Sequence, residues 1–389
     1  MGKEESRMRL TLGVMARSGK PNERRLPIHP LHLDRISAEA RSGIFLEHGY
    51  GEPFGVSDER LATLIGGLRT RDELIAECDV ILLAKPLLAD VQQLRDGQVL
   101  WGWPHCVQDP ALTQVAINKK LTLIAFEAMN HWTASGDYDL HVFHQNNELA
   151  GYSSILHSFS LMGVTGDYGR RLSAVVIGFG ATARGAVTAL NAQGVHDVSV
   201  LTNRDVAAVS SPIHSAHIVQ IARIEHDAAN PGRSSVLTDS GAMPLAPFLA
   251  ERDVIVNCVL QDPNAPLTYL DEADVSHLRS GSLIVDVSCD EGMGFSWARP
   301  TTFTNPTFIV GDNVTYYAVD HSPSYLWNSA SWVISEALLP YLEDVLGGAD
   351  TWAGNETVRR AIEIQGGVIQ NTAILEFQGR TAAFPHAIA

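Results

Sequence analysis

The chain has 389 residues, which is enough for two domains of ordinary size. Hydrophobic residues make up 45% of it and charged residues 19%, a composition typical of globular proteins and unlike that of disordered or fibrous chains. The formal net charge of −16 argues against binding to nucleic acids or anionic membranes. Any anionic ligand must therefore be bound by local cationic groups.

The cysteines and apolar segments bear on the cellular compartment. Four cysteines lie far apart, without CxxC or metal-ligand spacing, so we expect reduced residues and no metal site: Cys78, Cys106, Cys258 and Cys289. No apolar run approaches the roughly 20 residues that a membrane span needs, and the first residues lack an apolar signal core. We expect a cytoplasmic protein with small-molecule partners, not nucleic acid or membrane.

Strand-like and helical segments alternate through the first half of the chain, which predicts an α/β domain with a mostly parallel sheet. Strands are expected at 9–15, 44–47, 79–84, 99–103 and 121–126, and helices at 31–40, 61–78 and 110–119.

Three polar residues follow the ends of successive buried strands: Lys85, His105 and Glu127. Ligands of open α/β sheets bind at the carboxyl ends of the strands. Each residue also has a plainer interpretation, as a solvated lysine, a surface histidine or a helix-capping acid. Their shared placement favours a functional site.

The stretch at 174–185 has the strand–turn–helix pattern of a dinucleotide site. Four apolar residues precede Gly178, which suits a tight turn. Gly180 lets a pyrophosphate approach the backbone, and Ala183 stands where a third glycine usually lies. The start of the following helix favours an anion. The alternative is a turn that needs glycine only for packing.

The next strand, at 196–201, ends in Thr202, Asn203 and Arg204. A guanidinium beside hydroxyl and amide donors suits a 2′-phosphate, so NADP(H) is favoured over NAD(H). In the alternative, Arg204 is a solvated residue and Asp205 binds the ribose of NAD.

The remaining pattern predicts two Rossmann-like α/β domains with parallel sheets, the dinucleotide-binding one inserted into the substrate domain. A helix at 151–163 crosses between them, and strands at 252–259 and 282–288 follow, the latter with Asp290 beyond its end. The segments at 332–345 and 356–364 read as helices without strands of their own. The expected boundaries are 1–144 and 321–389 for the substrate domain and 145–320 for the dinucleotide domain.

Several stretches between Gly13 and about Leu346 together resemble the alanine dehydrogenase family in its broad sense. This group includes alanine dehydrogenase, saccharopine dehydrogenase and N5-(carboxyethyl)ornithine synthase. The residues that carry the resemblance are NERRLPIHP at 22–30, DVILLAK at 79–85, GQVLWGWPH at 97–105, DVSCD at 286–290 and RPTTFTNPTF at 299–308.

Finer features are similar to particular branches of that family. The "ERR" of the first stretch looks closer to the saccharopine and ornithine enzymes than to alanine dehydrogenase, and the DHSPS segment at 320–324 looks like saccharopine dehydrogenase. GYSSIL at 151–156, SPSYL at 322–326 and the Thr202–Arg204 tip look like the NADP-using ornithine enzyme. Alanine dehydrogenases tend to carry an asparagine where this chain has His321.

The resemblance implies reductive amination of a 2-oxo acid, with hydride from the nicotinamide. Arg25 is the expected partner of the 2-oxo acid carboxylate, since a guanidinium matches it bidentately. Lys85 would polarise the carbonyl, hold the carboxylate or act as a base, and His105 would shuttle the proton near neutral pH.

Three further residues receive roles from the same resemblance. Asp290 would orient the amine or the nicotinamide end of the cofactor, and Glu127 and His321 would recognise the amine substrate. The leading interpretation is an NADPH-dependent opine-type dehydrogenase, which couples an amino-acid amine to a small 2-oxo acid or runs in reverse.

Two alternatives stay open at this stage. One is an alanine-dehydrogenase-like enzyme that uses ammonia, and the other is a non-catalytic NADP(H)-binding protein. Relatives include monomers and larger assemblies, so a homo-oligomer is compatible with the resemblance, and no sequence feature decides the assembly.

Overall fold

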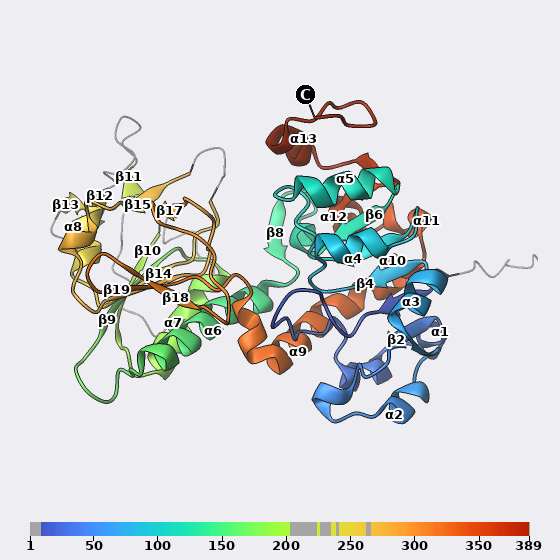
Figure 1. Ribbon diagram of the computed structural model, residues 1–389, viewed down its shortest axis with the longest axis horizontal. Coiled ribbons are helices and arrows are strands. Elements are labelled where there is room, and N and C mark those ends of the chain that lie inside the picture. The colour runs from blue at the N-terminus through green and yellow to red at the C-terminus, as the bar shows by residue number, and fades with distance from the viewer. Residues whose placement is uncertain (1–8, 203–223, 226–234, 239–240, 262–265, 389) are drawn as a thin grey trace, which may run out of the picture. The chain divides into compact units, whose positions relative to one another are not determined.

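The computed structural model describes residues 9–202, 224–225, 235–238, 241–261 and 266–388 (Figure 1). The chain divides into two compact units. The first unit comprises Met1–His144 and Trp327–Ala389, and the second unit is the continuous segment Gln145–Leu326. None of the helices among the described residues is both long and apolar enough to cross a membrane.

The first unit is built on an eight-stranded sheet with the order β21-β20-β6-β5-β4-β1-β2-β3. Six neighbouring strands are parallel, and β20 and β21 add antiparallel at one edge. The strands are β1 (Leu12–Val14), β2 (Ile44–Glu47), β3 (Gly67–Arg69), β4 (Val80–Leu82), β5 (Val99–Gly102), β6 (Thr122–Ala125), β20 (Ile362–Gln365) and β21 (Val368–Ile369).

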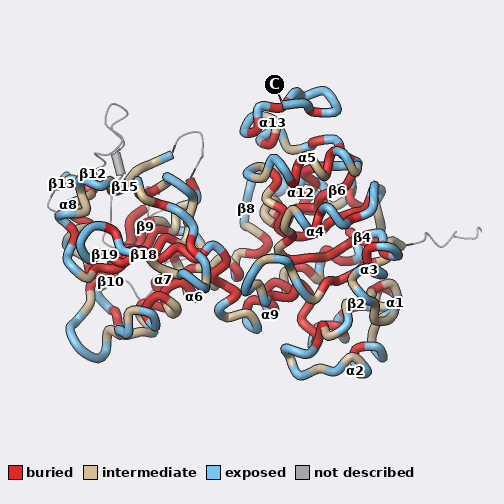
Figure 2. The backbone as a smooth tube through the Cα atoms, viewed as in Figure 1, coloured by how far each residue is buried: buried red, intermediate tan, exposed pale blue. Residues whose placement is uncertain are grey.

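Both faces of this sheet are covered, as a parallel sheet requires. Along β4, Val80 and Leu82 enter one apolar core while Ile81 enters another, and all three are fully buried (Figure 2). The helices are α1 (Ala38–Ser42), α2 (Asp58–Ala62), α3 (Arg71–Glu77), α4 (Leu88–Gln93), α5 (Pro110–Asn118), α9 (Trp327–Leu338), α10 (Leu342–Leu346), α11 (Ala349–Trp352), α12 (Glu356–Ala361) and α13 (Thr372–Gln378), with a hairpin of β7 (Asn130–Trp132) and β8 (Tyr138–His141).

The second unit is built on a six-stranded sheet with the order β10-β9-β14-β16-β19-β18, parallel except for β18. Its strands are β9 (Ser173–Ile177), β10 (Asp197–Leu201), β14 (Val254–Asn257), β16 (Leu283–Asp286), β18 (Thr307–Val310) and β19 (Val314–Tyr317), and its helices are α6 (His144–Met162), α7 (Ala181–Ala192) and α8 (Leu245–Ala250). Two small sheets complete the described elements: β11 (Ile224–Glu225), β12 (Ser235–Thr238) and β13 (Gly241–Pro244), and β15 (Thr268–Leu270) with β17 (Gly294–Phe295).

The predicted α/β class is confirmed, but three predicted elements are wrong. The segment 31–40 is not one helix, because a 3-10 helix, Pro30–Arg35, ends before α1 begins at Ala38. The segment 61–78 is not one helix, because α2 ends at Ala62 and β3 intervenes before α3. Gly66 allows that course: a Cβ there would lie 2.4 Å from the Ser42 carbonyl oxygen.

The C-terminal segment also contains strands, where only helices were expected. Helix α12 ends at Ala361, and β20 then pairs antiparallel with β6. Ile362 and Ile364 alternate with Glu363, a β-branched pattern that fits a sheet edge better than a helix. The C-terminal segment therefore completes the sheet of the first unit.

Candidate active site

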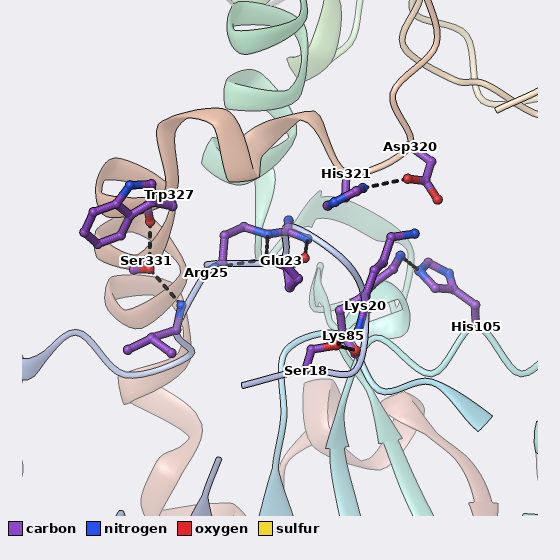
Figure 3. A network of polar contacts seen from close by, with 11 residues as sticks. Ser18, Lys20, Glu23, Arg25, Lys85, His105, Asp320, His321, Trp327 and Ser331 are labelled. Carbon is purple, nitrogen blue, oxygen red and sulfur yellow. Dashed lines mark hydrogen bonds and ion pairs between the residues drawn. The ribbon is translucent and has the colours of Figure 1, made fainter. Parts of the chain in front are cut away.

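The three polar residues predicted at the edge of the first sheet lie together. Lys85 follows β4, His105 follows β5, and Glu127 follows β6 in a short 3-10 turn, Phe126–Ala128. Lys85 Nζ lies 2.6 Å from His105 Nε2 (Figure 3). The carboxyl ends of three adjacent parallel strands thus bring a cation, an imidazole and a carboxyl group to one place.

Glu127 holds the backbone of His105. Its Oε1 accepts the His105 backbone N–H at 2.6 Å and lies 3.8 Å from the ring Nδ1. His105 has φ +50, a conformation that is uncommon outside glycine and that collects at functional sites. The Ser18 hydroxyl donates to the Lys85 carbonyl on the other side of the pair.

Arg25 is 7% exposed, and a glutamate two residues earlier in the chain binds it. Arg25 Nε donates to Glu23 Oε1 at 2.9 Å, and Nη2 donates to Oε2 at 2.6 Å (Figure 3). The guanidinium also lies over the Trp103 ring, 5.2 Å from its centroid. Sequence reasoning missed Glu23, although a buried arginine needs a carboxylate partner.

A second acid missed by sequence reasoning affects this site. Glu363, on β20, is 4% exposed and accepts a hydrogen bond from Asn371 Nδ2 at 3.0 Å. Burial, and then the charge of Glu363, raise the pKa of Glu127 above its ordinary value. No local signal marks Glu363, because β20 reaches this edge from the far end of the chain.

The second unit has an open turn between β9 and α7. Gly178 has φ +115, and its N–H donates to the Leu201 carbonyl at 2.7 Å. Gly180 is the residue before α7, and a Cβ on it would meet no atom within 4 Å. The 12-residue helix starts here with N–H groups that lack intrahelical partners. This geometry fits the pyrophosphate of a dinucleotide.

Helix packing explains the other small residues of this stretch. Ala183 is fully buried, so an alanine suffices at the position where a third glycine was considered. The close approach occurs at Gly185, where a Cβ would lie 1.8 Å from the Glu148 carbonyl oxygen of α6. Gly151 of α6 makes the reciprocal approach, with a Cβ 1.9 Å from the Thr182 carbonyl oxygen.

The predicted 2′-phosphate contacts are described only in part. Thr202 follows β10 and is 4% exposed. Asn203 and Arg204 lie outside the described residues.

The loop after β16 places Asp290 in the second unit. Asp286, fully buried, accepts hydrogen bonds from Tyr316 Oη at 2.6 Å, Asn257 Nδ2 at 2.9 Å and the Cys289 N–H at 3.1 Å. Cys289 has φ +49, so the loop turns sharply just before Asp290. Burial raises the pKa of Asp290. Asp286 anchors the start of this loop through these hydrogen bonds, and it was not singled out from the sequence.

His321 also belongs to the second unit and is 4% exposed. Its Nδ1 lies 2.7 Å from Asp320 Oδ1, and its ring meets the Phe303 ring edge-on at 4.9 Å between centroids. The aspartate of the DHSPS segment thus fixes the orientation of its histidine. Among the described residues, no group of three or more histidine, cysteine or acidic side chains is arranged to hold a metal ion.

Two α/β units, one with an open glycine turn before a helix and the other with a lysine–histidine pair at its sheet edge, define a dehydrogenase that uses a nicotinamide dinucleotide. Two family models match the chain: "Alanine dehydrogenase/PNT, N-terminal domain" over residues 14–150 and "Alanine dehydrogenase/PNT, C-terminal domain" over residues 160–372. The chain belongs to the alanine dehydrogenase/PNT family.

Known proteins resemble it over most of its length. An alanine dehydrogenase of Mycobacterium tuberculosis is 25% identical over 343 residues, which cover 83% of this chain and 84% of that protein. An N(5)-(carboxyethyl)ornithine synthase of Clostridium botulinum is 24% identical over 328 residues, which cover 82% and 89%. These relatives confirm the predicted family and an oxidoreductase acting on CH–NH groups.

Solved structures share the fold. An L-alanine dehydrogenase superposes with a TM-score of 0.73 at 18% identity, covering 95% of this chain and 99% of that one. A transhydrogenase from Sinorhizobium meliloti gives 0.67 at 18% identity, covering 93% and 99%. The predicted Rossmann-like architecture is thereby confirmed. The protein is a dehydrogenase that acts on amino acids with a nicotinamide dinucleotide.

Proposed function

We propose that this chain is an opine-type dehydrogenase, which condenses the amine of an amino acid with a small 2-oxo acid and reduces the product, or catalyses the reverse oxidation. The observation that carries the chemistry is the 2.6 Å contact between Lys85 Nζ and His105 Nε2, a proton donor–acceptor pair at the carboxyl edge of a parallel sheet. The Asp320–His321 pair of the DHSPS segment, in which His321 is buried, and the similarity to an N(5)-(carboxyethyl)ornithine synthase favour an amino acid as the amine.

The cofactor, when bound, supplies the hydride that reduces the imine. Gly178, Gly180 and the first N–H groups of α7 hold its pyrophosphate in this proposal. The residues Thr202, Asn203 and Arg204 favour NADP(H), because their hydroxyl, amide and guanidinium donors suit a 2′-phosphate. Asp290 orients the amine or the nicotinamide end.

In the first unit, Arg25 binds the carboxylate of the 2-oxo acid, held in place by Glu23. Lys85 polarises the carbonyl, and His105 gives and takes the proton as water leaves. The contacts of Glu127 favour a role in positioning His105 over the expected role in recognising the amine. His321 remains the proposed amine-recognition residue. The reaction consumes one amine, one 2-oxo acid, one hydride and one proton, and it releases water.

A second function is supported by the similarity to the alanine dehydrogenase of Mycobacterium tuberculosis. In that case ammonia replaces the amino acid, with the same roles for Arg25, Lys85 and His105. His321 is then the distinguishing residue, because an ammonia site has no second amino acid to recognise.

The test is oxidation of NADPH and NADH by the purified protein with pyruvate or 2-oxoglutarate and a panel of amines: ammonium, ornithine, lysine and other amino acids. We expect turnover with an amino acid, and faster turnover with NADPH than with NADH. Turnover with ammonium alone would replace the opine function with the alanine-dehydrogenase-like one. Preference for NADH would overturn the assigned role of Arg204.

A further inference from the structure

Two acidic side chains from distant parts of the first unit lie behind His105. Glu127 follows β6, and Glu363 is on β20, the strand paired with β6. The pairing places Ile362 opposite Ile124 and Ile364 opposite Leu123, with a register shift at Glu363 between them. Burial, and then the charge of Glu363, raise the pKa of Glu127.

Each of the two carboxyl groups has one oxygen without a hydrogen-bond partner among the described residues. Glu127 Oε1 accepts the His105 N–H, whereas its Oε2 is shielded from solvent and accepts nothing. Glu363 Oε1 accepts from Asn371, whereas its Oε2 is likewise shielded and unpartnered. The Glu127 side chain is 26% exposed, so the shielding applies to Oε2 in particular.

Few charges are available to balance two carboxylates. Lys85 and His105 face Glu127 from the strand ends beside it, and the Cys106 thiol, a weak donor, lies beside both acids. Among the ion pairs of the described residues, Glu363 takes part in none. His141 is a further titratable group nearby: its ring contacts the Glu127 backbone carbonyl, and burial lowers its pKa to about 4. Arg359 and Arg360 of α12 both pair with Glu356.

Glu363 is buried and Glu127 is shielded from solvent at Oε2, so each carboxylate has lost part of its hydration. Two such neighbouring carboxylates repel each other, and the doubly ionised pair is disfavoured. A proton retained by one acid needs an acceptor, and the unpartnered oxygen of the other acid supplies one. We propose that Glu127 and Glu363 share one proton and relay protons from solvent to His105. The second part of this proposal rests on the proposed function, in which His105 is the proton shuttle.

A cavity on the Glu363 side provides the entry point for protons. It has a volume of about 590 Å³ and is lined by residues that include Glu363, Asn371, Gln365 and Gln370, of which Gln365 and Gln370 are exposed. Because Glu363 lines this cavity, water there lies next to its side chain. The relay therefore approaches His105 from the side away from Lys85.

The relay conserves charge at each step. As His105 gives up a proton at Nε2, it takes one at Nδ1 from Glu127, and the O–H bond at Glu127 breaks. Glu363 then takes one proton from cavity water and passes it to Glu127, where the O–H bond forms again, so the acid pair returns to one proton and one negative charge. The 3.8 Å gap between His105 Nδ1 and Glu127 Oε1 can be closed by side-chain rotation or one bridging water.

The first experiment measures the shared proton directly, without turnover. Infrared difference spectroscopy of the full-length protein at neutral pH detects the C=O band of a protonated carboxyl group. We expect this band in the wild type and in Glu356→Gln, an exposed glutamate on α12 that serves as the matched control. We expect a weaker band that titrates at lower pH in Glu363→Gln and in Glu127→Gln, because loss of the neighbouring charge lowers the pKa of the remaining acid while burial still raises it. A wild type without the band, or an unchanged band in Glu363→Gln, overturns the shared proton.

The second experiment tests the relay with the amine and 2-oxo acid that support turnover. We expect Glu363→Gln to lower kcat about tenfold with little change in KM, to shift the pH profile of kcat and to raise the solvent isotope effect. Glu356→Gln should change none of these. An unaltered kcat, pH profile and isotope effect in Glu363→Gln overturns the relay.

The two experiments separate the relay from the proposed function. If no substrate supports turnover, the proposed function is refuted. The infrared measurement still decides whether the two acids share a proton. If turnover proceeds and the infrared band is absent, the proposed function stands and the shared proton falls. Comparable unfolding midpoints for the two glutamine variants of the acid pair show that the loss is not one of folding.

Discussion

The two units carry their functional residues in opposite ways. In the first unit, charged side chains are tied to one another: Lys85 to His105, and Arg25 to Glu23, at 2.6 to 2.9 Å. In the second unit, the candidate site depends on glycines, which have no side chain. Gly178 and Gly180 leave the backbone open at the start of α7.

The first unit thus depends on reactive side chains, and the second on open space beside the backbone. In the first unit, the identity and protonation of a few groups set the outcome, and a small chemical change is felt at once. In the second unit, the volume next to the backbone sets the outcome, so adding one methyl group is the informative change. Four predictions test this contrast.

The largest effect is expected for His105→Ala. Loss of the imidazole removes the proposed proton shuttle and should lower kcat about a thousandfold, within the range of general acid–base catalysis. Binding of the dinucleotide by the second unit should be unchanged in a fluorescence titration.

His48→Ala is the matched control, because the His48 side chain is 57% exposed in the same unit and contacts Asp58. It should retain wild-type turnover. The prediction for His105 is refuted if the alanine variant turns over at a near-normal rate when chemistry limits the reaction.

The contrast also explains what the sequence could and could not predict. Lys85, His105 and Glu127 were predicted together because parallel strands end at one edge of a sheet. Gly178 and Gly180 were predicted because a local pattern specifies the turn. Both inferences need only short stretches of chain.

The missed features depend on contacts between distant segments. Glu363 reaches Glu127 only because 362–365 becomes a strand, while 356–364 reads as a helix by its local pattern. Pairing with β6 overrides that preference, since a strand with Ile362 and Ile364 gains a partner at the sheet edge. Glu23 was near in sequence, but its role appears only once Arg25 is known to be buried.

The second prediction compares two glycines that follow β9, Gly180 before the first residue of α7 and Gly185 within α7. Gly185→Ala should destabilise the protein by about 3 kcal/mol, because the new Cβ would lie 1.8 Å from the Glu148 carbonyl oxygen and the α6–α7 packing must shift. Urea unfolding measures this change.

Gly180→Ala should leave the unfolding free energy unchanged, because its Cβ meets nothing within 4 Å and its φ of −81 suits alanine. It should raise the Kd of the dinucleotide about tenfold by obstructing the approach to the helix N–H groups. If Gly180→Ala binds the dinucleotide normally, the open turn is not the pyrophosphate site.

The third prediction compares adjacent arginines. Arg25→Lys should raise the KM for the 2-oxo acid about tenfold, because an ammonium group cannot keep the two parallel hydrogen bonds to Glu23 and also present the further guanidinium N–H groups to a substrate carboxylate. Arg24→Lys should change KM little, since Arg24 is exposed and lies over the Trp327 ring. Equal effects of the two substitutions would contradict the assignment of the carboxylate to Arg25.

The smallest effect is a dependence of stability on pH, and it compares two buried acids within the second unit. Burial raises the pKa of Asp286 to about 6, so the folded protein keeps a proton that the unfolded chain loses above its ordinary value of 3.8. The stabilisation from Asp286 is present below pH 3.8 and is lost as the pH rises towards 6. The pKa of Asp253 shifts in the opposite direction: burial acts to raise it, but hydrogen bonds from Arg170 and Ser173 lower it overall. The stabilisation from Asp253 is therefore lost as the pH falls.

Urea unfolding across this pH range, for the wild type, Asp286→Asn and Asp253→Asn, separates the two acids. The wild type should lose at least about 1 kcal/mol relative to Asp286→Asn as the pH rises from 3.8 to about 6. Relative to Asp253→Asn it should gain stability as the pH rises. The difference in unfolding free energy between the wild type and Asp286→Asn could instead be independent of pH. In that case the hydrogen bonds from Tyr316, Asn257 and Cys289 fully offset the cost of burying the charge. The loop that carries Asp290 would then be held by an ionised aspartate throughout this pH range.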